Sequence, residues 1–318
     1  MKKAFSVISN ISRSAIDILE NNNIDLTIDN LGNVPNTQEV ISLLNDYDIL
    51  IIGVKTLISK EILDYVKTPK IIATLSIGLD HIDKEVRDSN LIHVVNIKNA
   101  NTISVAEHIF SLILALNKRL YESYNLVLDK KGNKKNLHER PDDISNKKLG
   151  LIGAGNITKE VIKIAKVFNM PICCYTKNPD NHKDLLEYGV IFKTLDEVLK
   201  ESDIINVSIP LTEETKYLIS RDKINIMKPT ATFINTSRQD VVDTKALIEN
   251  ADKYNTFYVG LDIDLENYAD LLSVSRNNVI VTPHTAGVSK QAIERMDYEL
   301  ANKIIKCLKE ENNDNKIL

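Results

Sequence analysis

Three polar residues, Arg238, Glu266 and His284, each follow a short apolar run that is typical of a buried strand. A guanidinium binds carboxylates through paired hydrogen bonds, and an imidazole or a carboxyl group transfers protons near neutral pH. Ligands of open α/β sheets bind outside the carboxyl ends of the strands. The sequence therefore predicts an anion-binding and proton-transferring site at that edge of a sheet.

Simpler interpretations compete with this one. A single arginine is more often a surface charge, and a single histidine usually packs into the structure without reacting. His284 differs because it sits at a strand end, between Pro283 and Thr285-Ala286-Gly287. We expect a purely structural role for the other histidines, which are His81, His93, His108, His138 and His182.

The sequence Gly153-Ala154-Gly155 joins an apolar run to an amphipathic helical pattern, as in a strand–turn–helix unit. Gly153 permits a tight turn, and Gly155 lets the backbone approach a pyrophosphate. The N–H groups at the start of the helix, near Asn156 and Ile157, attract phosphates. Thr158 replaces the third glycine of the usual pattern. The motif predicts a dinucleotide site, and a tight turn without a ligand is the alternative for this motif alone.

The next apolar run, 172–175, is followed by Thr176 and Lys177. A site for NAD usually has an aspartate or glutamate here, about 20 residues after the glycines, that binds the ribose 2′-hydroxyl. A hydroxyl and an ammonium attract a 2′-phosphate, which a carboxylate would repel. The sequence therefore favours NADP(H) over NAD(H), unless Lys177 is a solvent-exposed lysine without a ligand.

Several sequence blocks, in this order along the chain, resemble the D-isomer-specific 2-hydroxyacid dehydrogenase family. The resemblance extends from about residue 49 to about residue 295, and blocks in the right order are more specific than any single motif. The blocks are SIGLDHID at 76–83, NTISVAEH at 101–108, GAGN at 153–156, and VSIPLT, NTSR and TPHTAG at 207–212, 235–238 and 282–287.

This resemblance implies roles for the three polar residues. His284 would be the general acid/base that protonates the ketone oxygen of a 2-keto acid as hydride arrives. Glu266 would orient His284 and raise its pKa, because a nearby carboxylate favours imidazolium. Arg238 would bind the carboxylate of the substrate and polarise its carbonyl group.

The resemblance also implies binding residues. Backbone N–H groups near Ile77 and Gly78, after Ser76, would hold the substrate carboxylate, and Lys55 could add positive charge there. Asp262 resembles the residue that hydrogen-bonds the nicotinamide carboxamide. The other residues implied to line the cofactor are Ser208, Ile209, Pro210, Thr236, Ser237 and Gly287.

Two departures from the family pattern stand beside the site. Glu266 lies one residue earlier than the acid of the family, where a short loop can absorb the shift, and Asp264 is its competitor. Gln239 replaces the glycine that follows the arginine. The first hypothesis is an enzyme that reduces small 2-keto acids or oxidises D-2-hydroxy acids. The alternative is a catalytically weak, nicotinamide-binding regulator on the same fold.

The implied fold is α/β, with two Rossmann-like or flavodoxin-like domains and parallel sheets. The substrate domain would be discontinuous, at 1–100 plus 288–318, and the nicotinamide dinucleotide-binding domain would occupy 101–287. A long helix, 104–124, would pack in the interface of a homodimer, although ordinary core packing explains its apolar stripe equally well.

The alternation of apolar runs and helical patterns independently predicts parallel sheets. A polar loop is expected at 130–146. Expected strands of the first series are 5–8, 26–29, 49–53, 71–75 and 93–95, with helices at 14–20, 39–44, 60–66 and 290–308. Expected strands of the second series are 149–152, 172–175, 204–207, 232–235, 258–262 and 279–282.

Composition excludes several other classes. The chain has 318 residues with 43% hydrophobic residues, a net charge of −4 and no apolar run long enough for a membrane span. We therefore expect no nucleic-acid partner and no membrane association. The cysteines, Cys173, Cys174 and Cys307, have neither the spacing of a disulfide framework nor that of a metal site, which favours the cytoplasm.

Overall fold

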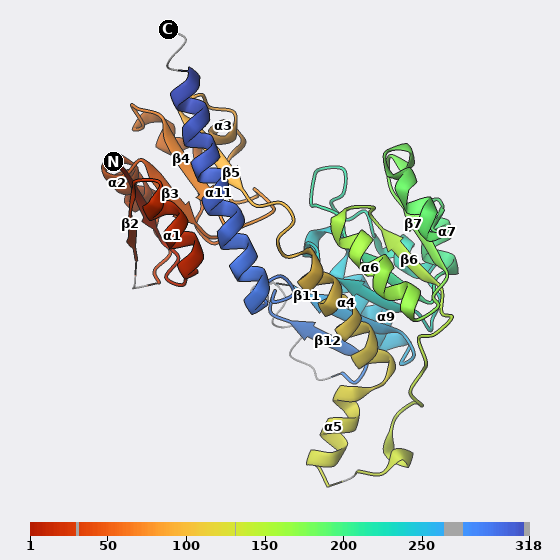
Figure 1. Ribbon diagram of the computed structural model, residues 1–318. Coiled ribbons are helices and arrows are strands. Elements are labelled where there is room, and N and C mark those ends of the chain that lie inside the picture. Colours follow the sequence, from red (N-terminus) through yellow and green to blue (C-terminus); the bar gives the residue numbers. More distant parts are fainter. Residues whose placement is uncertain (30–31, 131, 264–275, 315–318) are drawn as a thin grey trace. The chain divides into compact units, whose positions relative to one another are not determined.

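The computed structural model describes residues 1–29, 32–130, 132–263 and 276–314, which form two compact units (Figure 1). The first unit comprises Met1–Asn101 with Ser289–Leu318, and the second comprises Thr102–Val288. The boundaries expected from the sequence, after residues 100 and 287, each lie one residue from these divisions. Two polypeptide crossings therefore join the units.

The first unit is built on an all-parallel sheet with the strand order β2-β1-β3-β4-β5. Its central strands are apolar on both faces, as in a sheet that helices cover on both sides. Helices α1 and α11 pack on one face, and α2, η1 and α3 pack on the other. The strands are β1 (Lys2–Ser6), β2 (Ile24–Ile28), β3 (Ile49–Ile52), β4 (Lys70–Thr74) and β5 (Ile92–Asn96). The helices are α1 (Arg13–Asn21), α2 (Thr37–Asp46), the 3₁₀ helix η1 (Lys60–Asp64), α3 (Lys84–Arg87) and α11 (Lys290–Asp314).

The second unit has a parallel sheet with the order β12-β11-β10-β9-β6-β7-β8. The direction of winding reverses between β6 and β9, which is where doubly wound sheets bind ligands. Its strands are β6 (Leu149–Ile152), β7 (Ile172–Tyr175), β8 (Ile191–Phe192), β9 (Ile204–Val207), β10 (Thr232–Asn235), β11 (Tyr258–Asp262) and β12 (Val279–Thr282).

Helices cover both faces of the second sheet. The face that carries α4 and α6 forms one apolar core, and the face that carries α7, α8 and α9 forms another. Figure 1 shows α4 and α6 beside each other on their face. The helices are α4 (Thr102–Asn117), α5 (Leu120–Leu128), η2 (Lys134–Asn136), α6 (Asn156–Val167), η3 (Pro179–Tyr188), α7 (Leu195–Glu201), α8 (Arg221–Asn225), η4 (Gln239–Val241) and α9 (Thr244–Lys253).

The predicted α/β fold with two parallel sheets is confirmed, and the six strands predicted in the second half have the observed bounds. The single helix predicted at 104–124 is wrong, because the chain forms α4 and α5 with a break at Arg119. Arg119 has a left-handed backbone (φ 54°), and its buried guanidinium binds Glu122 at 2.5 Å and the hydroxyl of Tyr258 at 2.7 Å. These contacts redirect α5. Strand β8 and the helical turn η2 were not predicted.

Among the residues that the structure describes, no helix is both long and apolar enough to cross a bilayer.

One buried acid joins α11 to α1 in the first unit. Asp297 is 3% exposed, and its Oδ2 accepts a hydrogen bond from the N–H of Ser12 at 2.7 Å. Its Oδ1 is buried and finds no hydrogen-bond partner among the described residues, and it lies beside apolar residues such as Leu75 and Leu300. Burial therefore raises the pKa of Asp297, against the opposing effect of the Ser12 hydrogen bonds.

This raised pKa predicts how stability depends on pH. A carboxyl group whose pKa is higher in the folded chain than in the unfolded chain stabilises the fold below the unfolded pKa, and this contribution disappears as pH rises through the folded pKa. Asp297→Asn removes the buried charge and keeps an acceptor for Ser12. We compare the Tm of the variant with that of the wild type at each pH. We expect this difference in Tm to be roughly 2–4 °C more favourable to the variant at pH 7 than at pH 4.

The measurement is thermal unfolding of both proteins across this pH range, with Asp64→Asn, an exposed aspartate of the same unit, as control. A variant that loses the same stability at both pH values would contradict the prediction.

Candidate active site

The glycine turn after β6 has the geometry that a dinucleotide requires. Gly153 has φ 106°, and a Cβ there would lie 2.4 Å from the Ser208 carbonyl oxygen and 2.7 Å from Ile209. Only glycine fits, for both reasons. A Cβ at Gly155 would meet nothing within 4 Å, so the backbone before α6 faces open space. The exposed N-terminus of α6, at Asn156, can therefore receive a phosphate.

Thr158 takes the place of the third glycine without opening the turn. Its side chain is fully buried, and its hydroxyl donates to the Gly153 carbonyl at 2.9 Å. A side-chain hydrogen bond thus closes the strand–turn–helix unit at the position where the usual pattern has a glycine.

The loop after β9 lies against the glycine turn through Ser208 and Ile209. The hydroxyl of Ser208 accepts a hydrogen bond from Nδ2 of Asn206 at 2.9 Å, and Asn206 is fully buried in β9. This contact fixes one wall of the space above Gly155. Pro210 follows as an exposed residue of the same loop.

Thr176 and Lys177 follow β7, as predicted, with Thr176 half-buried and Lys177 exposed. The Nζ of Lys177 lies 2.6 Å from Oε2 of Glu214, in the loop after β9. The ammonium that the sequence assigned to a phosphate therefore faces a carboxylate in this structure.

Arg238 is held at the end of β10 by a buried amide. Asn235, 1% exposed, accepts hydrogen bonds from the N–H and the hydroxyl of Ser237 at 3.0 and 2.7 Å. Its Nδ2 donates to the carbonyl of Arg238 at 3.1 Å. The side chain of Asn235 thereby holds the turn that carries Thr236, Ser237 and Arg238.

Gln239 does not disturb this turn. It begins the helical turn η4 outside the left-handed region, so its backbone does not require the family's glycine. Its Oε1 is buried and has no hydrogen-bond partner in the described residues.

Asp262 organises the segment that carries His284. The carboxylate is buried at the end of β11, opposite Thr282 of β12 in the register. Oδ1 accepts from the Thr282 hydroxyl at 2.5 Å and from the Thr285 N–H at 2.8 Å, and Oδ2 accepts from the Ala286 N–H at 2.8 Å. His284, at φ 54°, lies at the exposed tip of the turn wound around this carboxylate.

His108 of α4 extends the same network. Its Nε2 lies 3.0 Å from Oγ1 of Thr282 and 3.8 Å from Oδ1 of Asp262. The single hydroxyl proton of Thr282 points to the carboxylate, so Nε2 of His108 must be the donor. Gly260 lets α4 approach β11, because a Cβ there would lie 3.2 Å from Leu112. His108, expected to be only structural, thus supports the turn of His284.

Glu266 and its competitor Asp264 lie outside the residues that the structure describes.

In the first unit, side chains shape the loop after β4 at Ile77 and Gly78. The Ser76 hydroxyl donates to the Gly78 carbonyl at 2.7 Å, and Nδ2 of Asn96 donates to the Ile77 carbonyl at 2.9 Å. Thr74 bonds to Ser76 at 2.9 Å and to Nε2 of His81 at 2.9 Å. Within the described chain, the N–H groups of Ile77 and Gly78 make no hydrogen bond. They remain available for an anion.

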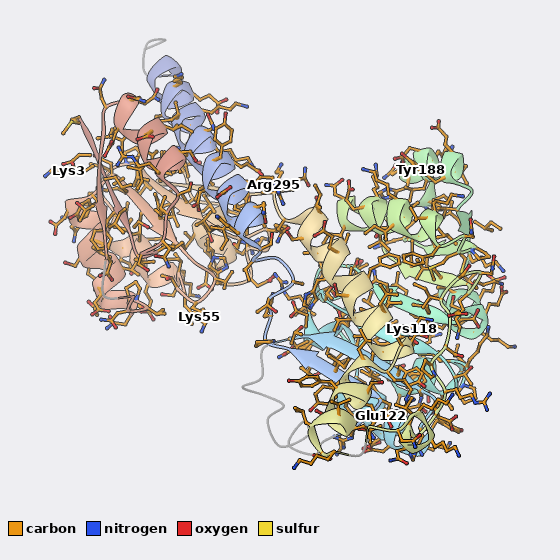
Figure 2. All side chains as sticks on the ribbon, turned by 60° about the horizontal axis from the view of Figure 1, so that its bottom comes forward. Lys3, Lys55, Lys118, Glu122, Tyr188 and Arg295 are labelled. Atoms are coloured by element: carbon orange, nitrogen blue, oxygen red, sulfur yellow. The ribbon has the colours of Figure 1, made fainter. Side chains whose placement is uncertain are left out.

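Lys55 follows β3 and lies at the periphery of the first unit (Figure 2). Its neighbours Val54 and Leu57 are also exposed.

The predicted residues of the second unit lie at or just after the carboxyl ends of six adjacent strands. In sheet order, the ends of β12, β11, β10, β9, β6 and β7 and the turns after them contribute His284, Asp262, Arg238, Ser208, Gly153 and Thr176. The carboxyl ends of parallel strands meet at one edge, so the sheet presents these groups side by side. Sequence reasoning missed Asn235, Thr282, His108 and Glu214 as site residues. Asn235, Thr282 and His108 carried a usable signal, since they lie in the NTSR, TPHTAG and NTISVAEH blocks, whereas Glu214 lies outside all of the blocks.

Known proteins resemble this chain in sequence. The family model described as "D-isomer specific 2-hydroxyacid dehydrogenase, NAD binding domain" matches residues 110–286. A hydroxypyruvate reductase of Thermotoga maritima is 34% identical over 85% of this chain and 88% of its own length. A glyoxylate reductase of Pyrococcus furiosus is 31% identical over 84% of this chain and 81% of its own length.

Solved structures match both units. An acyclic imino acid reductase in complex with NADPH and D-Arg has a TM-score of 0.85 and 30% identity, over 98% of each chain. The D-lactate dehydrogenase of Aquifex aeolicus, in complex with NAD and lactic acid, has a TM-score of 0.80 and 28% identity, over 99% of this chain and 97% of its own. By its sequence blocks, its strand order and these matches, the chain belongs to the D-isomer specific 2-hydroxyacid dehydrogenase family.

Proposed function

We propose that this protein is an oxidoreductase that transfers a hydride between a nicotinamide dinucleotide and C2 of a small 2-keto or D-2-hydroxy acid. The observation that carries this proposal is that a glycine turn, an arginine and a histidine follow β6, β10 and β12, at the carboxyl edge of one parallel sheet. The glycine turn suits a pyrophosphate, the guanidinium suits a carboxylate, and the imidazole suits proton transfer.

In this proposal His284 exchanges a proton with the substrate oxygen. The residue is exposed at the tip of its turn, where its ring can reach a ligand, and the Asp262 carboxylate anchors that turn. Arg238 binds the substrate carboxylate and polarises the carbonyl group. Glu266 orients His284, and Asp264 is the competing residue for that role.

A nicotinamide dinucleotide, when bound, supplies or accepts the hydride. We assign its diphosphate to Gly153, Gly155 and the N-terminus of α6, since the backbone there is open and carries the positive end of the helix dipole. We assign its nicotinamide end to Asp262 and the segment up to Gly287. Ser208, Ile209, Pro210, Thr236 and Ser237 line the remainder.

We further propose that NADP(H) is preferred to NAD(H). The end of β7 presents the Thr176 hydroxyl and the Lys177 ammonium, and no carboxylate occupies either position. Both groups favour a 2′-phosphate.

The substrate is proposed to be a small 2-keto acid such as glyoxylate or hydroxypyruvate, which the names of the two relatives suggest. In the first unit, the available N–H groups of Ile77 and Gly78 suit its carboxylate, and Ser76 shapes their loop. Lys55 adds positive charge. The groups assigned to acid–base catalysis favour an enzyme over a regulator. The cytoplasm is the proposed compartment, because Cys173 and Cys174 are free thiols.

The catalytic assignment predicts distinct effects of two substitutions. We expect His284→Asn to lower kcat by about 10²–10⁴-fold, since it removes the proton donor. We expect Arg238→Lys to raise KM for the keto acid, because lysine lacks the bidentate fork. The measurement is steady-state oxidation of NADPH and NADH with a panel of 2-keto acids, with cofactor affinity as control. Unchanged rates in both variants, or a wild-type protein that turns over no keto acid, would refute the proposal.

The His108 network predicts a matched pair of effects. His108→Leu removes the donor to Thr282. The turn that carries His284 should become less well ordered, and kcat should fall by about tenfold. The amide of His108→Gln can replace Nε2 and should restore most of the rate. The measurement gives kcat and the KM for NADPH separately. The KM should stay nearly constant in both variants, and only kcat should change. Equal loss in the two variants would assign His108 to packing alone.

We also propose a homodimer, and within the helix expected at 104–124 we assign its contact to the α5 part rather than to α4. The stripe of α4 is buried against the sheet. The apolar face of α5 is exposed, and its residues recur at helical spacing. Glu122, labelled in Figure 2, lies on the same helix and binds Arg119. The face consists of Leu120, Tyr121, Tyr124, Val127 and Leu128.

If a second copy covers this face, Tyr124→Asp combined with Leu128→Asp should convert a dimer into a monomer. Light scattering coupled to size-exclusion chromatography measures the mass. Val167→Asp, an exposed apolar position on α6, is the matched control and should leave the mass unchanged. A double variant that stays dimeric would exclude this face.

A further inference from the structure

The loop after β9 holds Glu214 in a fixed turn. The Thr212 N–H donates to the Thr215 hydroxyl at 2.7 Å, and that hydroxyl donates to the Pro210 carbonyl at 2.7 Å. The Thr215 N–H bonds to the Thr212 hydroxyl at 3.2 Å. Glu213 and Glu214 lie between these two threonines. These hydrogen bonds hold the backbone of both glutamates in one turn.

The two glutamates differ in what they contact. The Glu214 carboxylate lies 2.6 Å from the Lys177 ammonium, and this hydrogen bond lowers the pKa of Glu214, so the pair is ionic at neutral pH. Glu213, exposed in the same turn, makes no ion pair within the described residues. The chain thus offers a matched pair of carboxylates, one engaged with Lys177 and one not.

The ion pair spans the mouth of the glycine turn. Lys177 follows β7 and Glu214 follows β9, and β6 lies between these strands in the sheet. The pair therefore bridges the loops on either side of β6, the strand that ends at Gly153. We expect a nucleotide on this turn to place its ribose near the Lys177–Glu214 pair, because the residues after the second strand of such a unit bind the ribose.

We propose that Glu214 is a specificity-determining residue for the dinucleotide, because its carboxylate occupies the Lys177 ammonium and penalises a ribose 2′-phosphate. The inference rests on the proposed function. Thr176 and Lys177 provide the attraction for the phosphate, and Glu214 limits it. The preference for NADP(H) over NAD(H) is consequently small.

Electrostatics determines the size of the effect. Both side chains of the pair are 70% exposed, so their interaction with a phosphate is that of charges near water. Removal of one negative charge within several ångströms of a dianion should strengthen binding by about three- to tenfold at low salt. Salt screens charges over about 3 Å at 1 M, so the gain should largely disappear there.

The experiment measures nucleotide binding by titration calorimetry, without turnover. The probes are adenosine 2′,5′-bisphosphate and 5′-AMP, which differ only in the 2′-phosphate, followed by NADPH and NADH. Glu214→Gln should lower Kd for the bisphosphate and for NADPH by about three- to tenfold at low salt and change Kd for 5′-AMP and NADH by less than about twofold. Glu213→Gln should change neither the Kd ratio of the bisphosphate to 5′-AMP nor that of NADPH to NADH. Thermal unfolding confirms that each variant is folded.

Two kinds of failure are separable. If wild-type protein binds the probes and Glu214→Gln leaves their affinity ratio unchanged, weakens the bisphosphate, or acts no differently from Glu213→Gln, the inference is wrong and the proposed function stands. If wild-type protein binds none of the four nucleotides, the proposed function fails and the inference fails with it. Thr176→Asp tests the proposed NADP(H) preference separately, since it should shift the ratio towards NADH.

Discussion

The buried carboxylate of Asp262 is the interaction on which the second unit's candidate site depends. A buried carboxylate is costly unless donors surround it, and here the donors are the Thr282 hydroxyl and the N–H groups of Thr285 and Ala286. To supply them, the chain after β12 must wind back over the end of β11. That path puts His284 at its tip in a left-handed conformation, which a non-glycine residue adopts only when the surroundings impose it. The need to satisfy one charge thus fixes where the imidazole lies.

The two edges of the second sheet carry different kinds of polar residues: stabilising ion pairs at one edge and the candidate site at the other. At the amino ends of its strands, ion pairs tie the elements together. Nζ of Lys148, just before β6, donates to Oε2 of Glu201 at 2.9 Å, and Asp203, just before β9, accepts from Lys228 at 2.7 Å. At the carboxyl ends, by contrast, polar groups hold turns open towards ligands. Parallel strands make this division possible, since all of their carboxyl ends meet at one edge.

Local sequence signals were sufficient for most of the strands and for the glycine turn, because four- and five-residue apolar runs and a Gly153 turn are properties of adjacent residues. They were not sufficient for the two-residue strand β8 or for the bounds of β1, which was expected at 5–8 and lies at Lys2–Ser6. They were not sufficient where long-range contacts decide. Nothing near Arg119 in the sequence indicates that Tyr258 would bind its guanidinium and break the helix. Likewise, the partners of His108 and Lys177 are 174 and 37 residues away. A hydrogen-bond partner at such a separation is set by the register of the sheet and by loop paths, which periodicity does not encode.

The departures from the family pattern are compatible with the geometry that the family needs. Thr158 replaces a glycine whose purpose is close packing, yet its hydroxyl reaches the Gly153 carbonyl and closes the same turn. Gln239 replaces another, yet its backbone lies in a region open to any residue. A glycine is indispensable only where φ is positive or a Cβ would collide, and Gly153 meets both conditions. The substitutions at residues 158 and 239 therefore give no reason to expect weak catalysis, and the fit of the turn rather than a count of glycines is what links this chain to a dinucleotide.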